Sequence, residues 1–310
     1  MTSLPTSTSA STSSGIALPT PPSPASFTQA TTQLLQTARV ATTPCGDGSI
    51  VWHIWGEAGC DPALAPLVLL HGGSGSWTHW LLNIAPLVAS KRRVFVPDLP
   101  GFGDSAVPPV GGDADALVEP LAAGIRQLLG GVPCDLVGFS FGGLTGGLMA
   151  AAYPELIARL VLAGAPGLEV AAIEAVKLRS WAHLPDPADR EAAHRHNLAA
   201  LMFFDPESIT PLALELHIAN VVRDRLKGRR LARTGILLKA LPAMRFPVFA
   251  IYGREDVLYQ GKLPELETAL GQAADFRGLV LIDAAGHWVQ FEQAAAFDAA
   301  LRAALDAPAS

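Results

Sequence analysis

The sequence predicts an α/β fold with a mostly parallel β-sheet and an inserted helical segment. Three observations predict it. Short apolar runs alternate with longer stretches of helical periodicity. A serine flanked by glycines, Ser140, stands where one apolar run gives way to a helical stretch. Between residues 166 and 246, about eighty residues contain no convincing strand pattern.

The amino terminus has an unusual composition. The first 38 residues contain no Lys, Arg, Asp or Glu and are rich in Ser, Thr and Pro. A secretory signal needs a basic start and a continuous apolar middle, and this segment has neither. We expect residues 1–36 to form a disordered tail. The default expectation for the rest of the chain is a cytoplasmic enzyme.

The overall composition excludes several classes of protein. The net charge of −6 favours neither nucleic acid nor an anionic membrane as a partner. No apolar run reaches the ~18 residues of a membrane span. The three cysteines are an odd number without a C-x-x-C motif, so neither a disulfide framework nor a cysteine metal site is expected. The histidines between residues 183 and 217 lack metal-ligand spacing, and we expect no metal and no cofactor.

Seven strands are predicted from short apolar runs. Several of these runs lack alternation, which is typical of parallel strands covered by helices on both faces. We expect right-handed crossovers between the parallel strands. The predicted strands are Ile50–Trp55, Leu67–Leu70, Val94–Val96, Asp135–Gly138, Leu160–Ala163, Val248–Tyr252 and Leu279–Ile282.

The strand-free interval is expected to form a helical cap, or lid, over residues 167–243. The core would then comprise residues 37–166 and 244–307. Insertions of this size commonly form a lid or a substrate pocket. The periodicity predicts cap helices at Val170–His183, Asp189–Met202, Pro211–Leu226 and Arg229–Leu241.

Ser140 lies in a G-x-S-x-G motif between a predicted strand and a predicted helix, the pattern of a nucleophile elbow. Such a turn strains the serine backbone and exposes its hydroxyl. Gly138 and Gly142 would remove side chains that collide where helix meets strand. The helix amino terminus would then place unpaired N–H groups beside the nucleophile.

A serine hydroxyl needs a base, and the base needs a carboxylate that orients it. His287 and Asp256 each follow a predicted strand, and they occur after Ser140 in the chain order acid, then histidine. Carboxyl ends of parallel strands converge on one crevice, so the three side chains are expected to meet there. Glu255 competes with Asp256 for the acid role, and the spacing from the strand favours Asp256.

An oxyanion needs hydrogen-bond donors, and a glycine-rich turn at residues 71–75 follows the Leu67–Leu70 strand. The expected donors are the backbone N–H groups of Gly73 and Phe141. Gly72 or Ser74 stays an alternative to Gly73. The spacing does not match a phosphate-binding loop.

At this point the chain resembles the α/β-hydrolase superfamily. The resemblance covers about residues 40–305, through the stretches HGGSGSWTHW at 71–80, DLPGFGDS at 98–105, GFSFGG at 138–143, GREDVLY at 253–259 and GHWVQFE at 286–292. It implies the α/β-hydrolase fold: a mostly parallel eight-stranded sheet flanked by helices, a Ser140-His287-Asp256 triad, and a cap between the sixth and seventh strands. Asp98 and Asp104 match a stretch that shapes a loop, and we expect them to be structural.

Within the superfamily, the layout is most similar to hydrolases that cleave carbon–carbon bonds in aromatic ring-fission products. The stretch GHWVQFE and the cap segment Phe204–Thr210 carry this similarity. Two residues depart from it. Phe139 stands where those enzymes have Asn, and His217 stands where they have Arg. An arginine clamps a carboxylate bidentately, and a neutral histidine does not.

The expected partner is a small molecule, apolar or aromatic. Ser74, Phe139, Phe203, His217 and Trp288 are the candidate substrate-binding residues. The basic run at residues 223–230 is expected to be a solvated helix end, with steering of an anionic substrate as the alternative. The sequence leaves open whether the chain forms a homodimer.

The sequence therefore favours a serine hydrolase that cleaves an ester-like carbonyl through an acyl-enzyme. Hydrolysis of a carbon–carbon bond in a vinylogous diketone is the first alternative. Cofactor-free perhydrolase or haloperoxidase activity, and a non-catalytic small-molecule receptor, are further alternatives, because both can carry the same three residues.

Overall fold

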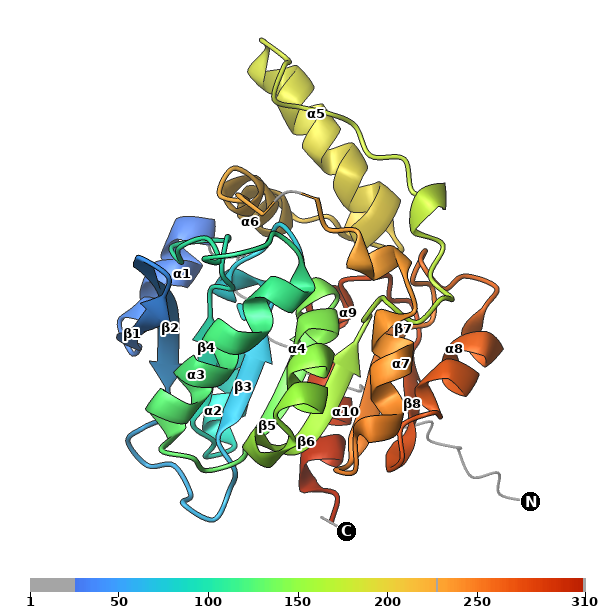
Figure 1. Cartoon of the computed structure of the whole chain (residues 1–310). Coiled ribbons are helices and arrows are strands. Elements are labelled where there is room, and N and C mark those ends of the chain that lie inside the picture. Colours follow the sequence, from blue (N-terminus) through green and yellow to red (C-terminus); the bar gives the residue numbers. More distant parts are fainter. Residues whose placement is uncertain (1–25, 227, 309–310) are drawn as a thin grey trace, which may run out of the picture.

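A computed structural model of the chain describes residues 26–226 and 228–308. An eight-stranded sheet forms the centre of the molecule, in the strand order β1-β2-β4-β3-β5-β6-β7-β8 (Figure 1). The strands are β1 (Arg39–Cys45), β2 (Gly48–Trp55), β3 (Leu67–Leu70), β4 (Val94–Pro97), β5 (Cys134–Phe139), β6 (Ile157–Ala163), β7 (Val248–Gly253) and β8 (Phe276–Ile282).

The predicted sheet is confirmed as eight-stranded and mostly parallel. Strands β4, β3, β5, β6, β7 and β8 run parallel, whereas β1 and β2 pair antiparallel with each other and β2 pairs antiparallel with β4. The pattern of apolar runs missed β1. That strand lies at the sheet edge, is largely exposed and contains Pro44, so it lacks the continuous apolar character of the inner strands.

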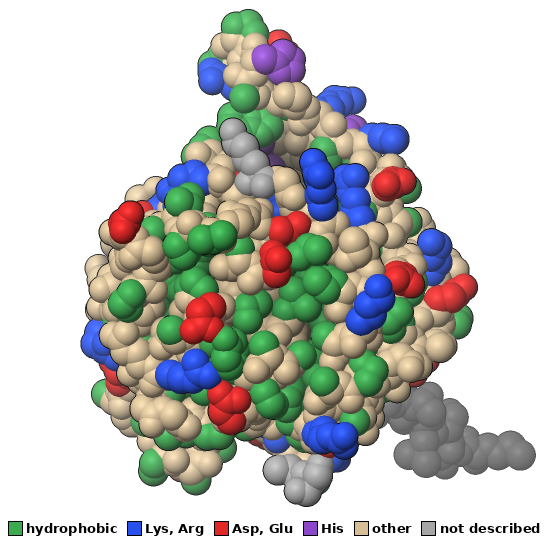
Figure 2. Space-filling model, viewed as in Figure 1, with side chains coloured by type: hydrophobic (Ala, Val, Ile, Leu, Met, Phe, Trp, Pro, Cys, Tyr) green, Lys and Arg blue, Asp and Glu red, His purple; other side chains and the backbone are tan. Residues whose placement is uncertain are grey.

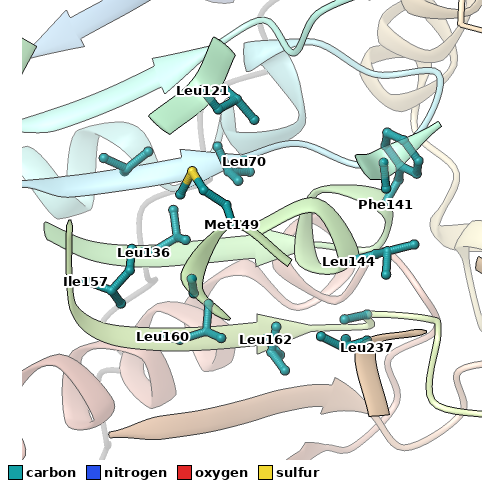
Figure 3. Packing of buried hydrophobic residues seen from close by; sticks show 14 of the residues in the cluster. Leu70, Leu121, Leu136, Phe141, Leu144, Met149, Ile157, Leu160, Leu162 and Leu237 are labelled. Atoms are coloured by element: carbon teal, nitrogen blue, oxygen red, sulfur yellow. The ribbon is translucent and has the colours of Figure 1, made fainter. Parts of the chain in front are cut away.

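Helices cover both faces of the sheet, which explains why the inner strands are apolar without alternation. One face packs against α3 (Val118–Leu129), α4 (Phe141–Ala152), α7 (Ile236–Ala240) and α8 (Leu263–Leu270). The other face packs against α2 (Ile84–Ala89), α9 (Val289–Glu292) and α10 (Ala294–Asp306). Figure 3 shows Leu136 and Leu160 of the sheet beside Met149 and Leu144 of α4. No helix in the described ranges is long and apolar enough to cross a membrane.

Between β6 and β7 the chain leaves the core. Helix α5 (Pro187–Asn197) projects from the molecule, and α6 (Pro211–Val221) lies nearer the core (Figure 1). Helix α7 packs against α4 in the core layer instead of projecting with α5. Figure 2 shows this protruding segment above the core, with Lys and Arg side chains gathered where the two join.

The predicted helix at Val170–His183 is wrong. Only a short 3-10 turn, Ile173–Ala175, forms there. The backbone of this segment is bonded elsewhere: the N–H of Ala172 donates to the carbonyl of Leu258, and the N–H of Arg179 donates to Oδ1 of Asn197 at 2.7 Å. Apolar side chains of this segment line a cavity, so the sequence has a helix-like spacing of apolar residues although no helix forms.

The disordered tail expected through residue 36 is too long. Residues 27–35 form helix α1 (Phe27–Leu35), capped by Ser26. Phe27 and Leu34 pack against the buried core, and the indole N–H of Trp55 donates to the carbonyl of Leu34 at 2.9 Å. The apolar side chains of this segment therefore order it despite its lack of charge. Residues 1–25 lie outside the described residues.

A buried charged cluster joins the start of three strands to the last helix. The carboxylate of Asp135 on β5 lies 2.8 Å from Nη1 of Arg92 and 3.3 Å from Nη1 of Arg159. All three residues are buried. Both arginines also donate to the carbonyl of Leu305, and Arg159 donates to that of Ala307. The cluster fixes the end of α10 (Ala294–Asp306) against the sheet.

We expect Asp135→Asn to lower the free energy of unfolding by ~3–5 kcal/mol, because it leaves buried Arg159 without its counterion and Arg92 with only the exposed Asp306 at 3.5 Å. Urea unfolding followed by circular dichroism measures the change. Glu155→Gln is the matched control, since it breaks the exposed Arg126–Glu155 pair and should cost no more than ~1 kcal/mol. Equal losses in the two variants would contradict the assignment of stability to the buried cluster.

Candidate active site

Ser140 lies at the turn between β5 and α4, with φ 51° and ψ −118°. This is a strained conformation for a residue with a side chain. The turn is held because the N–H of Ser140 donates to the carbonyl of Ala163 at 2.7 Å. A Cβ on Gly138 would lie 2.5 Å from Cα of Gly143, and one on Gly142 would collide with the carbonyl oxygen of His71. Both glycines are therefore required for the close approach of helix and strand.

The structure brings Ser140, His287 and Asp256 into one hydrogen-bonded chain. Nε2 of His287 lies 2.8 Å from Oγ of Ser140, and Nδ1 of His287 lies 2.8 Å from Oδ2 of Asp256. His287 stands in the loop after β8, and Asp256 stands in the loop after β7. Because β5, β7 and β8 are parallel, their carboxyl ends place these loops together.

The partners of Asp256 define the state of the imidazole. Asp256 is fully buried, and its second oxygen accepts from the N–H of Leu258 at 3.0 Å. A carboxylate beside Nδ1 holds the proton on that nitrogen and leaves Nε2 to accept from the serine hydroxyl. No hydrogen bond or ion pair joins Glu255 to His287 in the described part of the chain, so the geometry selects Asp256 over its competitor.

Gly73 and Phe141, which carry the expected oxyanion donors, lie beside Ser140. Phe141 is the first residue of α4, so its N–H has no acceptor within the helix. A Cβ on Gly73 would lie 3.6 Å from Cβ of Phe141, which places the two residues side by side. Across residues 26–226 and 228–308, neither N–H has an acceptor. The N–H of Gly72 is occupied, because it donates to Nδ1 of His79 at 3.2 Å.

Two adjoining cavities open beside the hydroxyl. The first, the catalytic chamber, has a volume of about 380 Å³ and is lined by Ser140, His287, Phe141 and apolar side chains that include Ile173 and Val176. The second, the cap chamber, has a volume of about 660 Å³ and is lined by residues that include His79, Trp181 and His217. The two chambers share the lining residues Gly73, Ser74, Leu178, Leu201, Met202 and Arg229.

The candidate substrate-binding residues divide into two groups. Ser74 lines both chambers, Phe139 lines the catalytic chamber and His217 lines the cap chamber. Phe203 and Trp288 line neither of these two chambers, and their expected contact with substrate stays a prediction. Both are buried in an aromatic cluster, where the Trp288 ring lies 4.3 Å from that of Phe291.

Trp288 instead supports a residue that the sequence analysis missed. Its ring lies 4.9 Å from that of His79, and its indole N–H donates to the carbonyl of His79 at 3.3 Å. Burial, together with the nearby His71 and His217, holds the pKa of His79 well below its usual value. Burial, with a smaller contribution from His194, lowers the pKa of His217 to about 4. Both imidazoles are therefore neutral at pH 7.

A charged network that was also missed links the cap to the predicted oxyanion loop. The hydroxyl of Ser74 donates to Asp224 at 2.6 Å. Arg229 donates to the same carboxylate at 2.9 Å and to Oγ of Ser74 at 3.2 Å. A Cβ on Gly73 would lie 2.5 Å from Nη1 of Arg229. The run at residues 223–230 was expected to be solvated, but its Arg229 lies in the wall of the site. The signal in the sequence was Asp224, the only acidic residue of the run, which pairs with Arg229.

The structure also shows where Asp98, which was expected to shape a loop, lies. Asp98 is buried and accepts from the N–H groups of Trp77 and Asp104 at 2.8 Å each, so it shapes the loop that follows β4. Within the described ranges, no group of three His, Cys, Asp or Glu side chains is arranged to hold a metal ion.

Known proteins resemble this chain in sequence and structure. Residues 65–210 match the family model described as alpha/beta hydrolase fold. A 2-hydroxymuconate semialdehyde hydrolase from Pseudomonas sp. (strain CF600) is 30% identical over 256 residues, covering 75% of this chain and 83% of that protein. A 2-hydroxy-6-oxo-6-phenylhexa-2,4-dienoate hydrolase from Burkholderia cepacia is 28% identical over 250 residues, covering 75% and 84%.

A solved carboxylesterase from Bacillus subtilis shares the fold, with a TM-score of 0.67 and 20% identity, covering 90% of this chain and 97% of that one. The chain therefore belongs to the α/β-hydrolase family. It is a hydrolase of that fold, with carbon–carbon bond hydrolases and esterases among its relatives and structural neighbours.

We expect Asp224→Asn to lower kcat for ester hydrolysis about tenfold, which corresponds to ~1.4 kcal/mol of barrier. Ser74 has a left-handed φ of 51° beside Gly73, and the variant removes the charged partner that holds it. Steady-state kinetics on a chromogenic ester separate kcat from KM.

The control is Arg223→Gln, which breaks the exposed Arg223–Asp104 pair at the same junction of cap and core. It should leave kcat within about twofold of wild type. A rise in KM alone for Asp224→Asn would show that the network binds substrate without acting on the oxyanion loop.

Proposed function

We propose that this chain is a serine hydrolase that cleaves an ester-like carbonyl and uses no cofactor. One observation carries the proposal: an unbroken hydrogen-bonded chain joins Ser140, His287 and Asp256, with 2.8 Å at each contact. The catalytic chamber beside it is largely apolar, which suits a small organic substrate.

In the proposed mechanism, His287 takes the proton of the Ser140 hydroxyl as the oxygen attacks the substrate carbonyl. The developing negative charge is stabilised by the N–H groups of Gly73 and Phe141. His287 then gives the proton to the leaving alcohol, and an acyl-enzyme remains. Water, activated by the same imidazole, attacks the acyl group and restores the serine. Asp256 keeps the imidazole in the required tautomer and stabilises its protonated form.

Hydrolysis of a carbon–carbon bond is the second candidate, because two relatives are named as hydrolases of this kind. The names of both relatives describe acidic, unsaturated keto compounds or semialdehydes. Phe139 and His217 argue against such a substrate here, because neither supplies a charged or amide donor for a carboxylate. The ester reaction is therefore preferred.

We expect Ser140→Ala to reduce ester hydrolysis by a factor on the order of 10⁴ or more, because the attacking atom is removed. A fluorophosphonate probe followed by mass spectrometry should add one covalent adduct to the wild type at Ser140 and none to the variant. Ser180→Ala is the control, since Ser180 lines only the cap chamber and should be labelled like wild type. A Ser140→Ala variant as active as wild type would end the proposal.

The two candidate reactions can be compared directly. With 2-hydroxy-6-oxo-6-phenylhexa-2,4-dienoate, we expect kcat/KM at least about tenfold below that for a short-chain p-nitrophenyl ester, since a neutral His217 lacks the strength of a charged hydrogen bond to a carboxylate. Absorbance of the dienoate and of p-nitrophenolate reports each reaction. The reverse order would make carbon–carbon hydrolysis the better assignment.

A further inference from the structure

The cap chamber is lined by a hydrogen-bond donor that the proposed chemistry does not use. His79 is 3% exposed, and its Nδ1 accepts from the N–H of Gly72 at 3.2 Å. That bond puts the ring proton on Nε2. Across residues 26–226 and 228–308, the Nε2–H group has no acceptor, and it borders open space instead of packed protein. The Nε2–H group is therefore free to donate to a molecule that enters the chamber.

A second imidazole lines the same chamber. His217 comes from α6, and its Nε2 is sealed from solvent without a partner in the described residues. Its ring lies 5.3 Å from that of His194, which in turn lies 4.7 Å from that of Trp181. These contacts hold His217 in place at the chamber wall. The chamber wall therefore contains two ordered imidazole rings, of which His79 presents its Nε2–H, unpaired among the described residues, to open space.

The charges around the chamber do not make it an anion site. Arg229 is compensated by Asp224 at 2.9 Å, and both line the chamber. Arg179 also lines it but is exposed, so its charge is screened by water. His79 and His217 are uncharged at neutral pH. The inner wall thus offers hydrogen bonds without a fixed positive charge.

We propose that the cap chamber is a subsite for an uncharged oxygen group of the substrate, a ketone, ester or hydroxyl oxygen that accepts from Nε2–H of His79, with the imidazole of His217 in the same wall. The inference rests on the proposed serine hydrolase function and names its substrate class: an ester that carries a second, neutral oxygen function away from the reacting carbonyl. The shared wall of the two chambers allows one molecule to extend from Ser140 into this subsite.

The test compares esters of equal shape and different polarity. One series varies the acyl side: p-nitrophenyl hexanoate, its 5-oxohexanoate, and the mono-p-nitrophenyl ester of glutarate, which replaces the ketone methyl group by a charged oxygen. The other series varies the alcohol side: pentyl acetate, 4-oxopentyl acetate and 4-acetoxybutanoate. Each series is repeated with two and four additional methylene groups. A pH-stat measures kcat/KM for all of them.

In the series whose variable side enters the cap chamber, acyl or alcohol, we expect kcat/KM of the ketone ester to exceed that of both the alkyl and the carboxylate ester by about tenfold. One hydrogen bond supplies a factor of this size. His79→Phe should abolish the preference of ketone over alkyl ester. The ratio is taken within one variant, so a general loss of activity cancels. His217→Arg should reverse the order and favour the carboxylate ester.

His183→Leu is the control, because His183 is exposed on the cap and should leave the ratio unchanged. Ser140-dependent hydrolysis of the alkyl esters without any preference for the ketone overturns the inference and leaves the proposed function intact. A wild-type preference for the carboxylate ester, or a ketone preference that persists in His79→Phe, also overturns it. The absence of any hydrolysis that depends on Ser140 overturns both proposals.

Discussion

The close contact between backbones at the Ser140 turn is the constraint on which the rest of the site depends. Helix α4 starts directly after the serine and passes against the end of β3, where a Cβ on Gly142 would strike the carbonyl oxygen of His71. If the helix moved outward, Oγ of Ser140 would leave its 2.8 Å contact with His287. The strained serine is held in place by its N–H bond to β6 and by the packing of Phe141 and Leu144 into the core (Figure 3). Local strain is thus maintained by the surrounding sheet and helix.

The cap holds both loops that complete the site. The carbonyl of Met202 accepts from the N–H of Trp288, the residue after His287. Glu292 accepts from the N–H of Gly286 at 2.6 Å and from that of Phe204 at 3.0 Å, so one carboxylate joins the histidine loop to the cap. On the other side, Asp224 and Arg229 hold Ser74. The segment between β6 and β7 is therefore part of the framework that holds the loops of His287 and Ser74 in place.

Sequence patterns were sufficient where chain order and strand ends decide position. The sheet, the elbow and the meeting of Ser140 with His287 and Asp256 follow from strands that all finish at one edge. Patterns were insufficient where position depends on packing across the cap. Arg229 belongs to a run that looks solvated, and its burial depends on the pairing with Asp224. Phe203 and Trp288 are large and apolar, like residues that line a pocket, but their side chains pack against each other.

Histidines illustrate the same limit. His79 lies in a single 3-10 turn, Trp77–Trp80, which is too short to give a periodic sequence pattern, so nothing in the sequence indicates which way its ring points. Only the bond from Gly72 and the contact with Trp288 place it in the cavity. Similarly, β1 was missed because an edge strand has one side open to water and does not need a continuous apolar run.

The charged cluster at the start of the central strands has a consequence for how the polypeptide matures. Arg92 and Arg159 both donate to the carbonyl of Leu305, which lies 213 and 146 residues later in the chain. Domains generally begin to fold from the amino terminus during synthesis. Here a nascent chain carries two guanidinium groups whose last acceptors have not yet been made. The cluster can therefore close only after α10 has been synthesised, so these contacts between residues far apart in the chain form late.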